Sequence, residues 1–227
     1  PIAFLLQETK LHTGSLPPPL GGLSTFRRDR SANGGGVAVL VPCAVQGHRV
    51  TSSLLRAAPA GLEAVAVECS VARLGIKLTL VSCYRPPGLS VALSSAFLEN
   101  LGNYLSELSA SGTPVILGGD MNLHLGSDEA KPLQDLLEGL EMECIGPKEP
   151  THGTARTLDW MFASRSFNQL SRASSRLLPP LEKSVLGHRV LAWDFPLPFL
   201  SPELCKRPVK KLVRGWRKAD KVLASSK

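Results

Sequence analysis

Apolar and polar residues alternate along several short stretches of the chain, as in strands with one buried face. Val65 and Val67 stand at alternate positions of one such run, and the run that begins at Gly36 repeats the pattern. The predicted strands are Ile2–Gln7, Gly36–Val41, Glu63–Cys69, Ile76–Cys83, Pro114–Leu117, Leu158–Phe162 and Val190–Trp193. The short turn Arg73–Gly75 predicts an antiparallel hairpin between the third and fourth runs, which excludes a purely parallel sheet.

Two other stretches have apolar residues at helical spacing. The first predicted helix runs from about Val91 to Ala110, with Ser90 as its N-cap, and the second from about Lys131 to Leu140. Their inward-facing residues are Leu93, Phe97, Leu98, Leu101, Tyr104, Leu105 and Leu108 in the first, and Leu133, Leu136, Leu137 and Leu140 in the second. Strands, then helix, strand and helix, then strands again predict stacked sheets with helices outside.

Length and composition favour one large domain. With 227 residues and 43% hydrophobic content, the chain can bury a substantial core, and we expect a domain over residues 1–195 followed by a tail over 196–227. The chain starts directly inside an apolar run, so we expect a piece of something longer. No apolar run reaches the roughly 20 residues that span a bilayer, and no membrane partner is expected.

Cysteine usage bears on the compartment. The five cysteines are scattered and show no paired metal-binding spacing. An odd, dispersed set is typical of a reducing, intracellular compartment and argues against a zinc site.

The positive charge is concentrated at the carboxyl end. The net charge is +7, and residues 206–227 hold nine basic side chains against one acidic one, which leaves the remainder nearly neutral. Attraction to nucleic acid, DNA or RNA, would therefore reside mainly in this tail. A solvated linker or a localisation signal explains the tail equally well.

The run Pro114–His124 has the most chemistry-bearing residues. Asp120, Asn122 and His124 follow two glycines at every second position, and in an extended backbone they would face one side. A carboxylate, a carboxamide and an imidazole together suit a site that activates water and holds phosphate oxygens. The glycines would let a ligand approach the backbone closely. A polar turn after the strand is the alternative.

Polar residues also end other predicted strands. Glu8 ends the first strand, where it could bind a hard cation such as Mg²⁺ or simply be exposed. Tyr84 precedes two prolines and could donate its hydroxyl to a phosphate. Asp159 and His188, if paired, would form a carboxylate–imidazole couple that stabilises charge on a phosphate. His12, His48 and His152 are interpreted as surface residues.

Six motifs occur in an order that resembles the endonuclease/exonuclease/phosphatase superfamily. They are Q-E-T-K at 7–10, G-G-V-A-V at 35–39, Y-R-P-P at 84–87, G-G-D-M-N at 118–122, L-D-W at 158–160 and G-H-R at 187–189. The resemblance covers roughly Ile2 to Phe195. P-T-H at 150–152 and the basic segment Gly215–Asp220 resemble, within that superfamily, the apurinic-like endonuclease domain of non-LTR retrotransposons.

This resemblance implies a fold and a site. The fold is a four-layer α/β/β/α sandwich of two mixed, largely antiparallel sheets, here without the N-terminal strand that carries an asparagine near the metal. The cofactor is Mg²⁺, with Mn²⁺ as an alternative, and Glu8 is the metal ligand. The other implied roles are water activation by Asp120, phosphate binding by Asn122 and Tyr84, further substrate contacts by Lys10 and His124, and charge stabilisation by His188 oriented by Asp159.

The implied function is a Mg²⁺-dependent endonuclease that nicks target DNA to leave a 3′-hydroxyl, in the nucleus, ahead of a reverse transcriptase domain. One departure is that the family's S-D-H is replaced by Leu186-Gly187-His188 in this chain. Because of that departure and the absent first strand, two alternatives remain: an inactive copy of the endonuclease, and a non-catalytic protein that binds nucleic acid or protein. A phosphodiesterase acting on lipid head groups is a further alternative.

Overall fold

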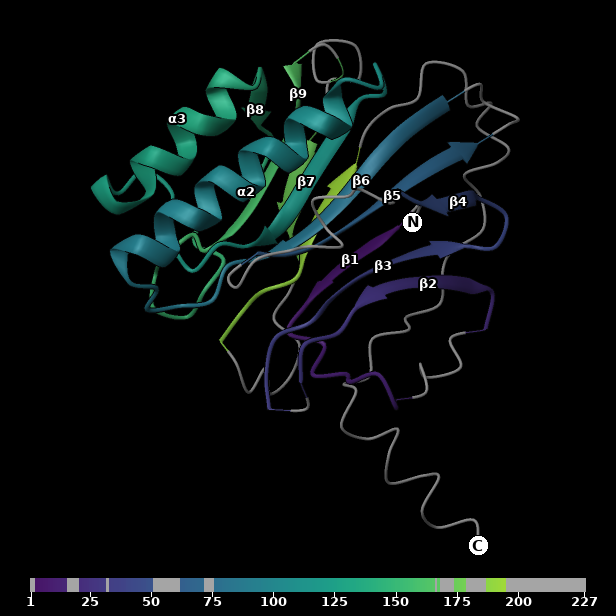
Figure 1. Cartoon of the computed structure of the whole chain (residues 1–227), viewed down its shortest axis with the longest axis horizontal. Helices are drawn as coiled ribbons and strands as arrows, with labels where there is room; N and C mark the ends of the chain where they lie inside the picture. Colours follow the sequence, from purple (N-terminus) through teal and green to yellow (C-terminus); the bar gives the residue numbers. More distant parts are fainter. Residues whose placement is uncertain are drawn as a thin grey trace, which may run out of the picture.

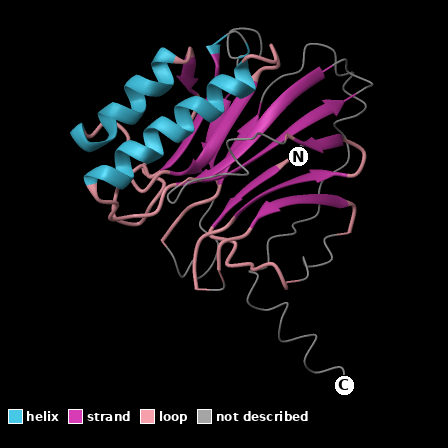
Figure 2. Ribbon diagram, viewed as in Figure 1, coloured by secondary structure: helices cyan, strands magenta, loops and turns pink. Residues whose placement is uncertain are grey.

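The computed structural model describes residues 3–15, 21–31, 33–50, 62–71, 76–165, 167, 174–178 and 187–194. Two sheets face each other in this part of the chain, and two helices cover the outer face of the larger sheet (Figure 1 and Figure 2). The predicted tail over 196–227 and the predicted turn Arg73–Gly75 lie outside the described residues.

The larger sheet has six strands in the order β4-β5-β6-β7-β9-β8. Its central pair, β6 and β7, is parallel because helix α2 carries the chain across between them, and the other pairs are antiparallel. The strands are β4 (Gln46–Arg49), β5 (Glu63–Val71), β6 (Ile76–Tyr84), β7 (Val115–Asp120), β8 (Met142–Cys144) and β9 (Asp159–Ser164).

The smaller facing sheet has three antiparallel strands in the order β1-β3-β2. They are β1 (Phe4–Gln7), β2 (Leu23–Arg28) and β3 (Val37–Pro42). Strands β10 (Ser174–Leu177) and β11 (Leu191–Asp194) form a separate antiparallel pair.

Strand β5 shows how the alternating sequence produces two cores. Val65 and Val67 point toward the three-stranded sheet and pack with the valines of β3, whereas Ala64 and Ala66 point toward the helices. Because successive side chains of a strand face opposite sides, one run of small apolar residues fills both layers. The two facing sheets thus share a continuous apolar interior.

The helices agree with the predicted ones. Helix α2 spans Val91–Ser109, and the Ser90 side chain accepts a hydrogen bond from the backbone of Leu93, as expected of an N-cap. A short 3₁₀ segment, η2 (Asp128–Ala130), leads into helix α3 (Lys131–Gly139). Leu93 was expected in the core but is 41% exposed, because it lies in the first turn, before the helix reaches the sheet.

The prediction of stacked sheets with helices outside is confirmed, and the early antiparallel pair is β5 with β6. Four strands were missed: β2, β4, β8 and β10. They lie toward the sheet edges, where burial is partial and the alternation is weak. No helix of the described residues is both long and apolar enough to cross a membrane.

Candidate active site

Three strands of the large sheet bring predicted site residues into one row. Tyr84 at the end of β6 is paired in register with Asp120 at the end of β7, and Asp120 is paired with Asp159 at the start of β9. Residues that are paired across neighbouring strands point to the same face of a sheet. Side chains from positions 84, 120 and 159 therefore meet at one edge.

The facing sheet brings Glu8 to this row. Ser82 donates to the backbone oxygen of Leu6 at 2.9 Å and accepts from the Gln7 side chain at 2.9 Å, so the end of β1 is fastened to β6. Gly118 makes the approach possible, because a Cβ there would lie 2.6 Å from the Leu5 side chain. The space at Gly118 is taken by β1 rather than by a ligand, so the expected use of this glycine was wrong.

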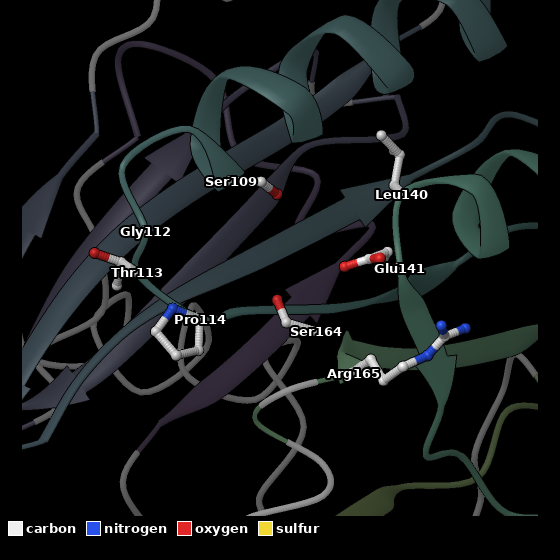
Figure 3. Close-up of a pocket in the computed structure, with 8 residues that line it drawn as sticks. All are labelled: Ser109, Gly112, Thr113, Pro114, Leu140, Glu141, Ser164 and Arg165. Atoms are coloured by element: carbon white, nitrogen blue, oxygen red, sulfur yellow. The ribbon is translucent and has the colours of Figure 1, made fainter.

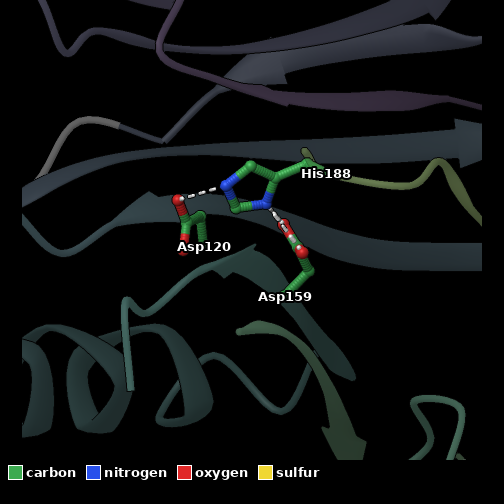
Figure 4. A group of neighbouring side chains, drawn as sticks. All are labelled: Asp120, Asp159 and His188. Carbon is green, nitrogen blue, oxygen red and sulfur yellow. Dashed lines mark hydrogen bonds and ion pairs between the residues drawn. The ribbon is translucent and has the colours of Figure 1, made fainter. Parts of the chain in front are cut away.

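His188 lies between two carboxylates (Figure 4). Its Nδ1 is 3.0 Å from Asp159 Oδ2, and its Nε2 is 3.8 Å from Asp120 Oδ2. The hydrogen bond to Asp159 raises the pKa of the His188 imidazole, although partial burial opposes the rise. The negative charges of Asp159, Asp120 and Glu8 also raise this pKa. The predicted pairing of Asp159 with His188 is therefore present, and it favours an imidazolium ion.

Asp120 is the buried carboxylate of the site, with 6% exposure. Burial raises the pKa of Asp120 to about 6, and the nearby negative charges of Asp159 and Glu8 add to this increase. The backbone N–H of Asn122 and the charge of His188 oppose it. A carboxylate with a pKa near 6 is ionised at neutral pH and remains basic enough to accept a proton.

Asn122 has a different geometry from the one expected. The strand ends at Asp120, and Asn122 adopts a left-handed conformation with φ of 50°, so strand alternation does not continue. Its backbone N–H donates to Asp120 Oδ1 at 2.9 Å. Its side-chain nitrogen donates to the Arg85 carbonyl at 2.9 Å and lies 3.3 Å from Asp120 Oδ2. Asn122 thus orients Asp120, and its contact with a phosphate stays a prediction.

Glu8 and Tyr84 form a pair across the two sheets. The Tyr84 hydroxyl donates to Glu8 Oε1 at 2.6 Å, and burial together with this bond raises the pKa of Tyr84. Lys10 Nζ is 4.0 Å from the other carboxylate oxygen of Glu8. Glu8 and Lys10 both have positive φ values, 50° and 54°, as the chain turns sharply after β1.

His124 lies beyond the end of β7, outside regular strand structure. Its side chain is exposed, and its Nδ1 accepts the backbone N–H of Thr157 at 3.1 Å. Because strand geometry stops at Asp120, position 124 no longer shares the face of position 120. The extended backbone on which its shared face was predicted therefore ends at Asp120, and a substrate contact by His124 stays a prediction.

Two residues that we had not assigned to the site support it. Thr151 Oγ1 accepts the backbone N–H groups of Leu158 and Asp159, both at 3.0 Å, and so fixes the start of β9. His152, interpreted from sequence as a surface residue, is partly buried, and its ring packs edge-on against His188 with centroids 4.7 Å apart. The P-T-H motif was the available signal for both residues.

Gly187 is required by this packing. Its φ is +74°, and a Cβ there would lie 2.9 Å from His152 Nε2. A side chain at position 187 would be strained and would displace the His152 ring. The glycine that replaces the family's aspartate is therefore part of the local structure.

The residues present fit a divalent cation. Glu8, Asp120 and Asp159 place three carboxylates close enough for their mutual repulsion to contribute to the raised pKa of Asp120. A divalent cation would relieve that repulsion, and carboxylate oxygens are the ligands that Mg²⁺ prefers. Asp120, Asp159 and His188 offer ligand atoms that all lie within 4.8 Å of one another and could hold it, whereas the role of Glu8 as the metal ligand stays a prediction.

A separate hollow lies at the opposite end of β7, where the end of α2 and the residue after α3 meet the sheet (Figure 3). Pro114, Glu141 and Arg165 are among its lining residues. The Ser164 hydroxyl there accepts the backbone N–H of Val115. Six residues of strand separate this hollow from Asp120, or about 20 Å, so it takes no part in the site.

Comparison with known proteins agrees with this fold. The Endonuclease/Exonuclease/phosphatase family matches residues 2–184. The endonuclease domain of TRAS1, a telomere-specific non-LTR retrotransposon, superposes with a TM-score of 0.61 at 15% identity, covering 87% of each chain.

Two further solved structures are similar at this level. The catalytic domain of human Nocturnin, with bound sulfate, gives a TM-score of 0.62 at 15% identity, covering 86% of this chain and 82% of that one. The 3′-5′ exonuclease NExo from Neisseria meningitidis gives 0.61 at 14% identity, covering 86% and 89%. No curated protein sequence matches the chain. With four-fifths of its length matched and the expected row of strand-end residues in place, the chain belongs to the endonuclease/exonuclease/phosphatase family.

Proposed function

We propose that this chain is a Mg²⁺-dependent DNA endonuclease domain of a non-LTR retrotransposon. The observation that carries the proposal is the position of His188 between Asp159 and Asp120, beside the Glu8–Tyr84 pair. This set combines a base, an imidazolium ion and a carboxylate for a hard cation. Those are the groups that hydrolysis of a phosphodiester needs.

Asp120 acts as the base. With a pKa of about 6 it is ionised above that pH, and Asn122 fixes its orientation through two contacts. Asp120 takes a proton from water, whose oxygen attacks phosphorus while the bond to the 3′ oxygen breaks. The leaving oxygen takes up a proton and becomes the 3′-hydroxyl, and the other fragment carries a 5′-phosphate.

His188 stabilises the negative charge that develops on the phosphate oxygens. Its Nδ1 is bonded to Asp159, so its Nε2–H is the donor that faces the reacting group. The Nε2 contact with Asp120 is long, at 3.8 Å, and is readily exchanged for a phosphate oxygen. Glu8 would hold Mg²⁺, or Mn²⁺, which would supply charge neutralisation and polarise the phosphate.

DNA is the substrate class that the similar structures favour. One is the endonuclease domain of a retrotransposon, and another, the 3′ phosphatase NExo from Neisseria, is bound to a product DNA hairpin. In an intact element the nicked end would prime a downstream reverse transcriptase in the nucleus. The basic tail, with nine positive side chains, would hold DNA or RNA nearby.

The test is nicking of supercoiled plasmid by the purified chain in Mg²⁺, with the ends characterised chemically. Conversion to open circles with 3′-hydroxyl ends is expected, and EDTA should abolish it. Asp120→Asn and His188→Ala should each reduce the rate by about 10³-fold, as removal of a charge-stabilising or proton-transferring group does.

A folded chain that leaves plasmid intact, or nicks it equally well as Asp120→Asn, would refute the proposal. Binding of DNA without cleavage would instead favour the non-catalytic alternative, for which Gly187 at the aspartate position is the specific observation. Hydrolysis of lipid head-group phosphodiesters without nicking of plasmid would favour the lipid phosphodiesterase.

A further inference from the structure

Arg30 lies beside the candidate active site, although no motif singled it out. Its guanidinium carbon is 5.9 Å from the centre of the Tyr84 ring, within the range of a cation–π contact. Its positive charge opposes the rise in the pKa of Tyr84, which places it close to the hydroxyl that contacts Glu8. Arg30 is therefore a cation at the rim of the site.

The backbone next to Arg30 is tied directly to the segment after Glu8. Thr9 donates its backbone N–H to the Gly36 oxygen at 3.1 Å, and Lys10 donates to the Gly35 oxygen at 2.9 Å. The Lys10 side chain in turn lies 4.0 Å from Glu8. Arg30 and Lys10 thus bring two positive charges to the Glu8–Tyr84 pair.

Arg30 is held by a buried acid. Its Nη1 donates to Glu63 Oε1 at 2.7 Å, and its Nε donates to the Gly34 oxygen at 3.0 Å. The other oxygen of Glu63, whose residue is 8% exposed, accepts the backbone N–H of Gly36 at 2.6 Å. Because Glu63 is satisfied on both sides, the guanidinium is fixed in place before any ligand arrives.

Gly35 leaves room for the Arg30 side chain to reach Glu63. Its φ is +71°, and a Cβ there would overlap the Arg30 guanidinium and lie 2.6 Å from Glu63 Oε2. A glycine at position 35 is therefore needed for Arg30 to reach Glu63. The G-G-V-A-V motif accordingly shapes an arginine site as well as starting β3.

One edge of the guanidinium remains available. Nε and Nη1 have the partners named above, and Nη2 has none among the residues that the structure describes. The side chain is 43% exposed. A fixed guanidinium with a free N–H edge is a donor for a phosphate oxygen.

We propose that Arg30 forms a subsite for a DNA backbone phosphate next to the one that is cleaved, with Tyr84 between the two. This inference rests on the proposed function for its ligand, and it adds a residue that determines substrate binding. A rigid arginine on the rim would set the register of the strand across Asp120 and His188 without reading its sequence.

The test is equilibrium binding of a fluorescent DNA duplex at several salt concentrations, measured by anisotropy with Arg30→Met and wild type. One lost phosphate contact should reduce the slope of log K against log salt by about 0.9. Affinity should fall about tenfold at low salt, and KM for nicking should rise while kcat stays within about threefold.

Arg176 offers a matched control. It is exposed and pairs with Asp194 through its Nε at 2.9 Å, so Arg176→Met also removes one arginine from one ion pair. This variant should keep the wild-type slope. An Arg30→Met slope equal to that of wild type would overturn the proposal, as would a loss confined to kcat, because that pattern indicates a role in holding Tyr84.

A second variant covers the case in which Arg30→Met leaves Glu63 buried without a partner and fails to fold. Arg30→Met combined with Glu63→Gln removes both charges, and the glutamine oxygen can still accept the Gly36 N–H. The same losses in slope and affinity are expected from this double variant.

An NMR titration with inorganic phosphate separates failure of the subsite from failure of the proposed function. The Nε–H resonance of Arg30 should shift on phosphate addition, and that of Arg176 should not. If the Arg30 resonance shifts but the chain binds no DNA, Arg30 belongs to an anion site whose ligand is not DNA. Absence of both the shift and a slope change would reject the subsite, whatever the nicking assay shows.

Discussion

The ring of His152 packs edge-on against the ring of His188, with 4.7 Å between centroids and 68° between planes. His152 Nδ1 accepts the backbone N–H of Thr154 at 3.2 Å, so its proton is on Nε2, the atom that lies over Gly187. Gly153 donates to the Gly187 oxygen at 2.8 Å and fastens the two segments together. Gly187 and His152 thus act together in setting the position of His188.

Gly187→Ala should destabilise the chain and reduce its activity. The new Cβ would meet His152 Nε2 at 2.9 Å on a backbone with φ of +74°, and left-handed alanine alone costs about 1–2 kcal/mol. We expect a lower midpoint of urea unfolding. Gly88→Ala, which also has a positive φ but has open space around it, should cost only the backbone strain.

Asp120→Asn should stabilise the chain while it slows nicking by about 10³-fold. The folded-state pKa of Asp120 is raised to about 6 from 3.8, so its ionisation lowers stability as pH rises from about 4 to 6. The variant should therefore be about 1–2 kcal/mol more stable than wild type at pH 8. Near pH 3, where Asp120 is largely protonated in both states, little gain is expected. Equal gains at pH 3 and pH 8 would contradict this account.

Asp159→Asn should lower the pKa of His188, because the Asp159 hydrogen bond is the largest cause of its rise. With a raised folded-state pKa, the imidazolium stabilises the fold below its unfolded pKa, and this contribution is lost as pH rises through the folded value. In Asp159→Asn, the stabilising contribution of the imidazolium is lost at a lower pH than in wild type. The alkaline limb of the pH–rate profile moves to lower pH as well. NMR titration of the His188 ring measures the change directly, and an unshifted titration would count against it.

Mg²⁺ should raise the melting temperature of wild type. At ten times the dissociation constant, binding to the folded state adds about 1.4 kcal/mol, or about 3–6 °C. Glu8→Gln should remove most of this shift, since glutamine still accepts the Tyr84 hydroxyl but carries no charge. Glu68→Gln, on β5 and paired with Lys77, is the matched control and should keep the shift. If Mg²⁺ raises the melting temperature of Glu8→Gln as much as that of wild type, the metal does not bind at Glu8.

Thr151→Val should damage the site through the backbone. The hydroxyl accepts the N–H groups of Leu158 and Asp159 and is fully buried, and valine leaves both donors unsatisfied. We expect a loss of about 2–3 kcal/mol in unfolding free energy. Thr113→Val, a buried threonine at the far end of β7, is the comparison, and it should lose less.

Much of the fold could be predicted, because burial leaves a periodic signal. Val65 and Val67 against Ala64 and Ala66 are the clearest case, since a central strand with two apolar faces must be rich in small branched residues. The edge strands β2 and β4 gave no such signal, because their side chains are only partly buried.

The site was predictable where a residue ends a buried strand. Tyr84 and Asp120 end β6 and β7, Asp159 begins β9, and the register of these three strands brings the residues together. The alternation rule used for His124 does not hold past the end of the strand, where Asn122 turns the chain with positive φ.

The sequence by itself determined the strands, the two helices and the kinds of side chain at the strand ends, because these depend on local periodicity and composition. Only the tertiary structure decided that His152 and Gly187 position His188, and that Glu63 holds Arg30 beside Tyr84. Such contacts join residues that are distant along the chain, and they depend on how two sheets pack and where each strand stops. No local pattern of residues encodes those distances.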